Sequence, residues 1–460
     1  MATIIKRKTK YAVVYNHIDE HGTKRQKWET WNTHKEALKR KAQIENDLFD
    51  GTFVAPNDQT VADFLFDFVS LYGEQHWGVS TYDSNVGLIG NYINPAIGKM
   101  LVQDITPKVI DIFYKKLKKT KSVTPHGRKP QKEYVTDVNI ERIHKLLKCA
   151  FKQAVRWEMI KKNPFELVTM KKTKYTPRDI WTAENIRKAL EACEDSKLYV
   201  AMNLAFACSL REGEILGLTW DNVYISDDDI AADDASIYVD KELTRCSKRA
   251  IEVLDKKEII KIFTPLKPNT STRLVLKKPK TDSSTRKVWL PKTVAYILRK
   301  WKDAQEELKG FLGDEYEDYN LVVALTNGRP CEGRILLKSF KELREKAGLP
   351  NVVFHSLRHS STTYKLKLNH GDLKATQGDT GHAEIDMITK VYAHILDDDR
   401  KINAQKFEAA FYSQPDLKDA KPSEEGKPGI DLNSLIEQLQ QSPELAATLA
   451  QLIQTGDSGG

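Results

Sequence analysis

The sequence predicts a multidomain protein: a small β-sheet plus helix module, an all-α domain, and an α+β domain that is mainly helical with a small sheet. The chain has 460 residues, enough for two to four domains of about 100–200 residues each. Apolar residues alternate as in strands near the N-terminus and recur every three to four residues from Thr60 onwards, which is typical of helices. Beyond Arg178, short strand-like runs alternate with helical stretches.

The first part of the chain predicts a hairpin followed by a helix. Runs at 10–15 and 24–31 have strand composition, and Asp19-Glu-His-Gly22 between them is a turn sequence. Thr33-His-Lys-Glu36 matches a capping box, so a helix that ends near Phe49 should follow.

The module at 2–55 is basic and aromatic. Alternation in its second strand gives one face with Lys24, Gln26, Trp28 and Thr30, and another with Arg25, Lys27, Glu29 and Trp31. Such a hairpin could lie in a DNA groove as β-ribbon proteins do, with Lys24, Arg25 and Lys27 as candidate DNA-binding residues. Composition alone slightly favours the alternative, a small sheet whose aromatics pack on the helix and whose lysines are solvated.

Residues 60–170 predict an all-helical domain. Its first apolar stripe consists of Val61, Phe64, Leu65, Phe68 and Leu71, and a second helix follows at 139–157. The polar face of that second helix carries four candidate DNA-binding cations: Arg142, Lys145, Lys148 and Lys152.

Charge is distributed unevenly along the chain. Lys and Arg number 72 against 64 Asp and Glu, a net charge of +8, and the basic excess is concentrated between 101 and 175. The segment 413–460 is acidic. A concentrated positive surface favours a polyanion, and nucleic acid is the foremost one. A solvated lysine-rich helical face is the competing interpretation, at about even odds.

The segment 178–412 predicts the α+β domain. Thr182 begins a helix, helices are expected within 190–218 and 356–367, and 237–239 and 287–290 have strand composition. The acidic tail, 413–460, begins with a Pro- and Gly-rich tether and ends in two short apolar stripes.

Several protein classes are excluded. The chain has no run of about 20 apolar residues, so a membrane span is not expected, and Met1–Lys8 lacks the apolar core of a secretory signal. The five cysteines form no CxxC pair, so neither a disulfide framework nor a metal site is expected. We expect a cytoplasmic protein without a cofactor.

Five elements of the third domain carry residues suited to phosphate chemistry. They are Arg211 in Leu-Arg-Glu-Gly-Glu214, Lys280 in Lys-Thr-Asp-Ser-Ser-Thr-Arg286, His355 and Arg358 in His-Ser-Leu-Arg-His359, His382 in Thr-Gly-His, and Tyr392 in Val-Tyr-Ala-His394. Each alone has an ordinary explanation: Arg211 could simply pair with Glu214, and a lysine in a polar turn is usually solvated.

Together, these elements resemble the tyrosine recombinase (phage-type integrase) family. The order Arg, Lys, His-x-x-Arg, Gly-His, Tyr is the catalytic order of that family, and Tyr392 follows His382 by ten residues. The resemblance extends upstream, because 143–164 is similar to the end of the core-site-binding domain of the family. Residues 2–55 resemble the arm-site-binding module of integrases from phages and conjugative transposons.

The chemistry requires these residue types. A DNA phosphodiester is an anion, and arginine forks bind its nonbridging oxygens and offset the charge of the transition state. The resemblance assigns this role to Arg211 and Arg358, with Glu214 supporting Arg211. It further implies these roles: Tyr392 as the nucleophile that forms a 3′-phosphotyrosine bond, His355 as acid or base, Lys280 as proton donor to the 5′-hydroxyl, and His382 as a phosphate hydrogen-bond donor.

The resemblance also implies partners. These are double-stranded DNA with core and arm attachment sites, a homotetramer on that DNA, an excisionase and a host DNA-bending protein, in a bacterial cytoplasm. Two alternatives stay open: a type IB topoisomerase-like enzyme, and a catalytically inactive DNA-binding regulator on the same scaffold.

One stretch departs from the pattern of the family. Residues 226–278 are longer than the usual strand-turn-strand before the lysine. A surface insertion is the ordinary explanation, and the sequence leaves the role of this stretch open. The extra length leaves Lys277 and Lys278 as alternatives to Lys280. After the nucleophile, Ile402–Tyr412 offers an apolar surface that we expect to dock onto a neighbouring protomer.

Overall fold

A computed structural model describes residues 2–380 except 19–22, 52, 55–56, 125–129, 131, 171–178, 257, 268, 280–283 and 370–371. Lys280, His382, Tyr392 and the tail at 413–460 therefore lie outside the described residues. Within the described ranges, no helix combines the length and apolar character that crossing a membrane requires.

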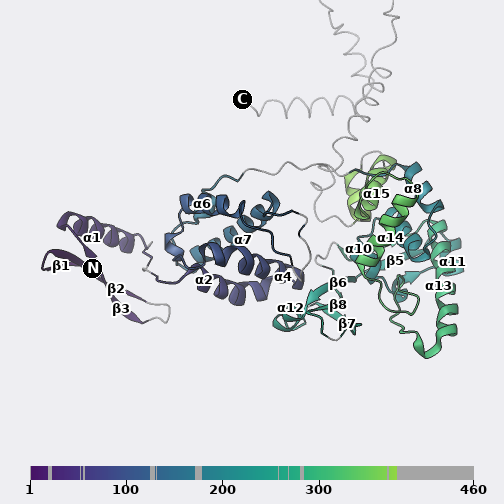
Figure 1. Ribbon diagram of the computed structural model, residues 1–460, viewed down its shortest axis with the longest axis horizontal. Helices are drawn as coiled ribbons and strands as arrows, with labels where there is room; N and C mark the ends of the chain where they lie inside the picture. Colours follow the sequence, from purple (N-terminus) through teal and green to yellow (C-terminus); the bar gives the residue numbers. More distant parts are fainter. Residues whose placement is uncertain are drawn as a thin grey trace, which may run out of the picture. The chain divides into compact units, whose positions relative to one another are not determined.

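The N-terminal module is a three-stranded antiparallel sheet beside one helix (Figure 1). Its elements are β1 (Thr3–Arg7), β2 (Lys10–Ile18), β3 (Lys24–Trp31) and α1 (His34–Phe49), and the sheet order is β1-β2-β3. The predicted hairpin is confirmed, and so is the capping box of Thr33 and Glu36. The strand β1 was not predicted, because its five residues are nearly all polar or exposed.

The second part is helical, as predicted. It contains α2 (Val61–Asp67), η1 (Phe68–Gly73), α3 (Glu74–His76), α4 (Val79–Leu88), η2 (Ile89–Ile93), α5 (Asn94–Ile97), η3 (Val102–Asp104), α6 (Pro107–Leu117), α7 (Asp137–Arg156) and η5 (Pro164–Glu166). The stripe from Val61 to Phe68 is buried, but Leu71 is exposed. That part of the prediction is wrong because the chain enters the π-helical turn η1, whose wider repeat rotates later residues away from the core.

The third part is mainly helical around a three-stranded sheet of order β4-β5-β9. Its strands are β4 (Val223–Tyr224), β5 (Ser236–Val239) and β9 (Arg286–Trp289). Its helices are α8 (Ala183–Glu191), α9 (Ser196–Ala207), α10 (Glu212–Gly217), η6 (Trp220–Asn222), α11 (Asp227–Ala231), α13 (Lys292–Leu312), η8 (Gly313–Glu315), α14 (Gly333–Lys346), α15 (His355–Leu368) and α16 (Leu373–Thr380).

The predicted helical stretch 190–218 contains two separate helices, α9 and α10, and α8 ends at its start. Asp195 accepts hydrogen bonds from the first N–H groups of α9 and so starts a new helix. Ser209, between α9 and α10, has φ +54°, which an α-helix cannot contain. The predicted strands at 237–239 and 287–290, and the helix cap at Thr182, are confirmed.

The long stretch before the lysine motif folds as a small subdomain, which we call the insert (residues 240–279). It consists of β6 (Glu242–Ser247), α12 (Lys248–Val253), β7 (Ile259–Ile262) and β8 (Thr272–Lys277), with sheet order β6-β8-β7. The ordinary explanation, a surface insertion, does not account for the insert. Apolar side chains of the insert belong to the cores of both the helical part and the third part.

Candidate active site

Arg211 immediately precedes α10. Its guanidinium donates a hydrogen bond of 2.6 Å to Glu214 Oε1 and one of 3.3 Å to the Ser284 hydroxyl. Its main-chain N–H donates to Glu214 Oε2 at 2.9 Å. Glu214 therefore fixes both the main chain and the side chain of Arg211, as a phosphate-binding group requires if it is to be preorganised.

Glu214 is a buried carboxylate shared by two arginines. Its side chain is 1% exposed, and Arg286 donates to its two oxygens at 3.1 and 3.4 Å. Burial alone would raise the pKa of the Glu214 carboxyl, but the charges and hydrogen bonds of Arg286 and Arg211 outweigh burial and lower that pKa. The carboxylate therefore stays ionised and holds both guanidinium groups. Sequence reasoning missed Arg286, although this arginine ends the lysine motif.

Arg358 connects two other parts of the site. Its guanidinium is buried on α15 and donates hydrogen bonds to the carbonyl oxygens of Ser209 and of Thr380, the latter at 2.6 Å. Ser209 lies two residues before Arg211, and Thr380 lies two residues before His382. Ser209 adopts a left-handed conformation, which costs a non-glycine residue about 1–2 kcal/mol. The rest of the site must offset that cost.

His355 begins α15, three residues before Arg358. Its ring is partly exposed, and it meets the ring of His359 edge to face with centroids 4.9 Å apart. The predicted helix at 356–367 is confirmed. One short helix thus supplies a buried guanidinium and a more accessible imidazole, the combination that a phosphate clamp and a proton carrier need.

The lysine turn reaches the site at its described end. Ser284, just before β9, accepts a hydrogen bond from Arg211. The described end of the sequence motif that contains Lys280 therefore lies beside the start of α10. Of the alternative lysines, Lys277 is buried and pairs with Glu242 at 2.5 Å, which commits it to the insert. Lys278 is exposed and stays an alternative.

The structure thus brings together segments that lie far apart in the sequence. Described residues place Arg211, Glu214, Ser284 and Arg286 in one hydrogen-bonded network, and Arg358 adjoins it through Ser209. Within the described ranges, no group of three or more His, Cys, Asp or Glu side chains could hold a metal ion.

The N-terminal module divides its candidate DNA-binding residues between two environments. Lys24 and Arg25 are exposed at the start of β3, whereas Lys27 faces α1 and pairs with Asp58 at 3.8 Å. The exposed face instead carries Trp28, with the Arg7 guanidinium 4.6 Å above its ring. On the α1 side, Glu29 accepts hydrogen bonds from Arg40 and Tyr15.

These inner bonds are short: Tyr15 donates to Glu29 at 2.5 Å, and Arg40 donates at 2.7 and 2.9 Å. They hold the sheet on α1, so the opposite face stays open to solvent. Sequence reasoning chose lysines by charge and therefore missed Arg7 and Trp28 as a stacked pair on that open face.

The four candidate cations of α7 are all exposed: Arg142, Lys145, Lys148 and Lys152. Arg142 and Lys145 line a groove of about 750 Å³ between α4, α7 and the insert. Its other lining includes small polar side chains of α4: Ser80, Thr81, Ser84 and Asn85. Cations beside hydroxyls and amides are the side chains that contact phosphates and base edges in DNA complexes.

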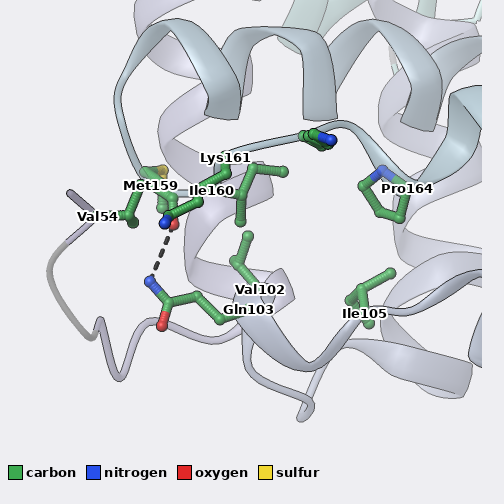
Figure 2. Close-up of a pocket in the computed structure, with 9 residues that line it drawn as sticks. Val54, Val102, Gln103, Ile105, Met159, Ile160, Lys161 and Pro164 are labelled. Carbon is green, nitrogen blue, oxygen red and sulfur yellow. Dashed lines mark hydrogen bonds between the residues drawn. The ribbon is translucent and has the colours of Figure 1, made fainter. Parts of the chain in front are cut away.

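A separate pocket of about 270 Å³ lies away from these residues (Figure 2). Its walls come from the end of the module, η3 and the segment after α7, and Gln103 donates a hydrogen bond to the Met159 carbonyl across it at 2.9 Å. Its lining combines apolar side chains with Gln103, Lys161 and Lys162 and contains none of the predicted catalytic residues, so it is not part of the candidate active site.

Two family models match the chain. The phage integrase family model matches residues 180–399, and the phage integrase N-terminal SAM-like domain model matches residues 61–118. The chain is 26% identical over 390 residues to a XerC-like tyrosine recombinase of Caldanaerobacter subterraneus subsp. tengcongensis, covering 82% of this chain and 90% of the relative. It is 25% identical to the ICEBs1 integrase of Bacillus subtilis, covering 71% and 77%.

Solved structures agree in fold. The Tn1549 transposon integrase in complex with transposon right end DNA has a TM-score of 0.54 and 20% sequence identity, covering 76% of this chain and 99% of that one. The two family models match segments of the helical part and of the third part. The described residues of the third part include Arg211, His355 and Arg358, which follow one another in the order of the motif. The chain belongs to the phage integrase family and is a tyrosine recombinase.

Proposed function

We propose that this recombinase integrates or excises a mobile element by cutting and rejoining DNA through a 3′-phosphotyrosine bond at Tyr392. The observation that carries the proposal is the network in which Glu214 and the Ser209 carbonyl hold Arg211 and Arg358. Two preorganised guanidinium groups can bind the nonbridging oxygens of one phosphate and offset the negative charge of its transition state.

The remaining roles follow from the motif. A tyrosine hydroxyl with an ordinary pKa of about 10 is a weak nucleophile, and nearby cations together with a base activate it. Tyr392 attacks the phosphorus, and His355 assists as acid or base. Lys280 protonates the 5′-oxygen as the P–O5′ bond breaks, so that it leaves as a 5′-hydroxyl, and His382 donates a hydrogen bond to a phosphate oxygen.

The covalent bond stores the energy of the broken phosphodiester. A 5′-hydroxyl from a partner duplex can attack the phosphotyrosine, release Tyr392 and complete the exchange of strands without ATP. The groove between α4 and α7 would bind the core site, and the open face of the N-terminal sheet would bind a distant arm site. Holding two DNA segments at once raises their effective concentration.

The DNA partner is supported by the fold shared with an integrase that was solved on transposon end DNA. We further propose a homotetramer on two duplexes, an excisionase and a host DNA-bending protein as partners, in a bacterial cytoplasm. The topoisomerase-like alternative is less consistent with a separate N-terminal module. The inactive-regulator alternative is less consistent with a complete catalytic motif.

A nicked suicide substrate tests the function. The substrate is a duplex from the DNA that flanks the gene, nicked near the cleavage point so that the short strand diffuses away and the covalent adduct is trapped. We expect an adduct with the wild type and none with Tyr392→Phe, while DNA binding stays equal in a gel-shift assay. Peptide mapping of the adduct identifies the nucleophile.

Tyr364 and Tyr412 are the tyrosines nearest to Tyr392 in the sequence. An adduct that persists in Tyr392→Phe would point to one of them. The Tyr364 hydroxyl already accepts a hydrogen bond of 2.7 Å from the Ala183 N–H, so we expect no adduct there. Tyr412 lies outside the described residues, and a Tyr412→Phe variant with a normal adduct serves as the matched control.

A further inference from the structure

The central strand of the insert, β8, contributes side chains to two different cores. Val275 packs with the core of the helical part, whereas Leu274 and Leu276 pack with the core of the third part. Successive side chains of a strand point to opposite faces of its sheet, so each face of this sheet is covered by a different part of the protein. The insert therefore packs against both the helical part and the third part.

On the helical side, the insert is anchored to α4. Asp83 accepts a hydrogen bond from the Ser247 N–H at 2.9 Å and another from the Ser247 hydroxyl. The same hydroxyl accepts the Ala250 N–H at 3.0 Å and so starts α12. Ile251 and Cys246 are buried beside this anchor in the core of the helical part. One polar anchor and an apolar contact thus hold α4 on the insert.

On the catalytic side, the same strand β6 contacts the helix that follows Arg211. A Cβ added to Gly217 of α10 would lie 2.7 Å from the main-chain nitrogen of Leu243, so α10 rests directly on the start of β6. Farther along the strand, Arg245 pairs with Glu332 at 2.6 Å, just before α14. The strand β6 therefore runs from α10 at one end to α4 at the other.

We propose that the insert determines at which phosphate the DNA is cut. It would do so by fixing the distance between the core sequence bound in the α4–α7 groove and the active site around Arg211. This inference rests on the proposed function. A strand rises about 3.3–3.4 Å per residue, so the five steps from Glu242 to Ser247 span about 17 Å. Successive nucleotides of a B-DNA strand are about 3.4 Å apart along the axis. If α4 shifted along β6 by the length of one strand residue, the cleavage position would therefore move by about one nucleotide.

The insert is a positioning element, because Asp83, Ser247 and Ile251 act through α4 and β6 and do not touch the scissile phosphate. A loosened anchor would widen the range of distances between the bound sequence and Arg211. Native cleavage would then fall while cleavage at neighbouring phosphates rose. A general loss of folding would lower both together and leave their ratio unchanged.

The test uses the full-length protein and two variants. Asp83→Ala removes the polar anchor, and Ile251→Asp places a charge in the apolar contact. Asp111→Ala, an exposed carboxylate on α6 of the same part, is the control. Accessibility of Cys246 to a thiol reagent, measured by mass spectrometry, reports loss of the anchor. Cys208, which is buried in the other core, reports that the third part stays folded.

Cleavage positions are mapped at nucleotide resolution on nicked duplexes made from the DNA that flanks the gene. In at least one anchor variant we expect Cys246 to become accessible while Cys208 stays protected. In that variant, the ratio of neighbouring to native cleavage should rise by about tenfold or more, given that a misplacement of about 1 Å can cost 10²-fold in rate. The control should match the wild type.

Two results would overturn the proposal. One is an unchanged cleavage ratio in a variant with accessible Cys246 and protected Cys208. The other is a protected Cys246 in both variants, which would mean that this anchor does not hold the insert on α4. Absence of any adduct from the wild type is a different outcome, because it contradicts the proposed function itself.

Discussion

The guanidinium of Arg358 donates a hydrogen bond to the carbonyl oxygen of Ser209, two residues before Arg211. The two arginines predicted to bind the scissile phosphate are thus connected through one main-chain group. Because Arg358 also donates to the Thr380 carbonyl, its loss removes the proposed phosphate donor and also leaves the Ser209 and Thr380 carbonyl oxygens without this hydrogen-bond partner.

We expect Arg358→Lys to slow cleavage of the suicide substrate by about 10²-fold or more, the scale of removing one preorganised donor. Lysine keeps the charge but lacks the planar fork that can bind two oxygens at once. The control is Arg344→Lys, since Arg344 also donates to a main-chain carbonyl, that of Val352, at 2.8 Å on α14. Near-normal single-turnover cleavage by Arg358→Lys would refute its phosphate-binding role.

Glu214→Gln should lower the free energy of unfolding by about 3 kcal/mol at pH 7, because it leaves Arg211 and Arg286 without their buried counter-charge. The pKa of Glu214 is lowered from its ordinary value of 4.5. The stabilisation by its carboxylate is therefore complete above pH 4.5 and is lost as pH falls below it. Urea unfolding at pH 7 and pH 3.5 measures the effect.

The difference in stability between wild type and Glu214→Gln should therefore shrink at the lower pH. Glu317→Gln is the matched control, because Glu317 also pairs with an arginine, Arg329, but its side chain is 40% exposed, against 1% for Glu214. A pair open to solvent contributes less, about 0–1 kcal/mol for fully exposed pairs. A difference that is equally large at both pH values for Glu214→Gln would contradict the ionised pair.

The elements that follow from local rules could be predicted from the sequence. The capping box at Thr33, the apolar stripe from Val61 to Phe68 and the helix after His355 depend on residues a few positions apart. The two candidate catalytic arginines, Arg211 and Arg358, were identified by motif, and the structure adds which groups hold them. Local patterns carry this information because each element satisfies its own hydrogen bonds and buries its own stripe.

The features that depend on distant pairing could not be predicted. Glu214 and Arg286 lie 72 positions apart in the sequence, and nothing in the motif indicates which partner a buried arginine selects. A surface insertion was the ordinary explanation of the insert because the sequence does not show that Val275 and Cys246 are buried, which happens only in the assembled fold. Leu71 was misplaced because a π-helical turn has no sequence signature of its own.

Deleting residues 1–55 should leave cleavage of a core-site suicide substrate intact and impair recombination between full attachment sites. The described catalytic network lies wholly outside the module. Trp28→Ala is the point variant, because Trp28 is 41% exposed and stacks with Arg7 on the open face. Phe49→Ala, which removes an exposed aromatic at the end of α1, is the control.

A gel-shift assay with arm-site DNA should show weaker binding by Trp28→Ala and normal binding by Phe49→Ala, with core-site binding equal in both. Stacked aromatics and arginines contribute about 1–3 kcal/mol to nucleic-acid contacts. Full-site recombination at the wild-type rate by the truncated protein would show that the module does not hold arm DNA.

Truncation after Asp399 should weaken synapsis and unbalance strand exchange, whereas truncation after Gln414 should do much less. Between these points the sequence holds the apolar residues Ile402, Phe407, Ala410 and Phe411, which lie outside the described residues. We expect them to dock onto a neighbouring protomer in the proposed tetramer. The later stripes are too short to be stable as isolated helices, and their acidic surroundings disfavour DNA contact. Native gels with attachment-site DNA compare both variants, and normal synaptic complexes from the Asp399 truncation would contradict docking between protomers.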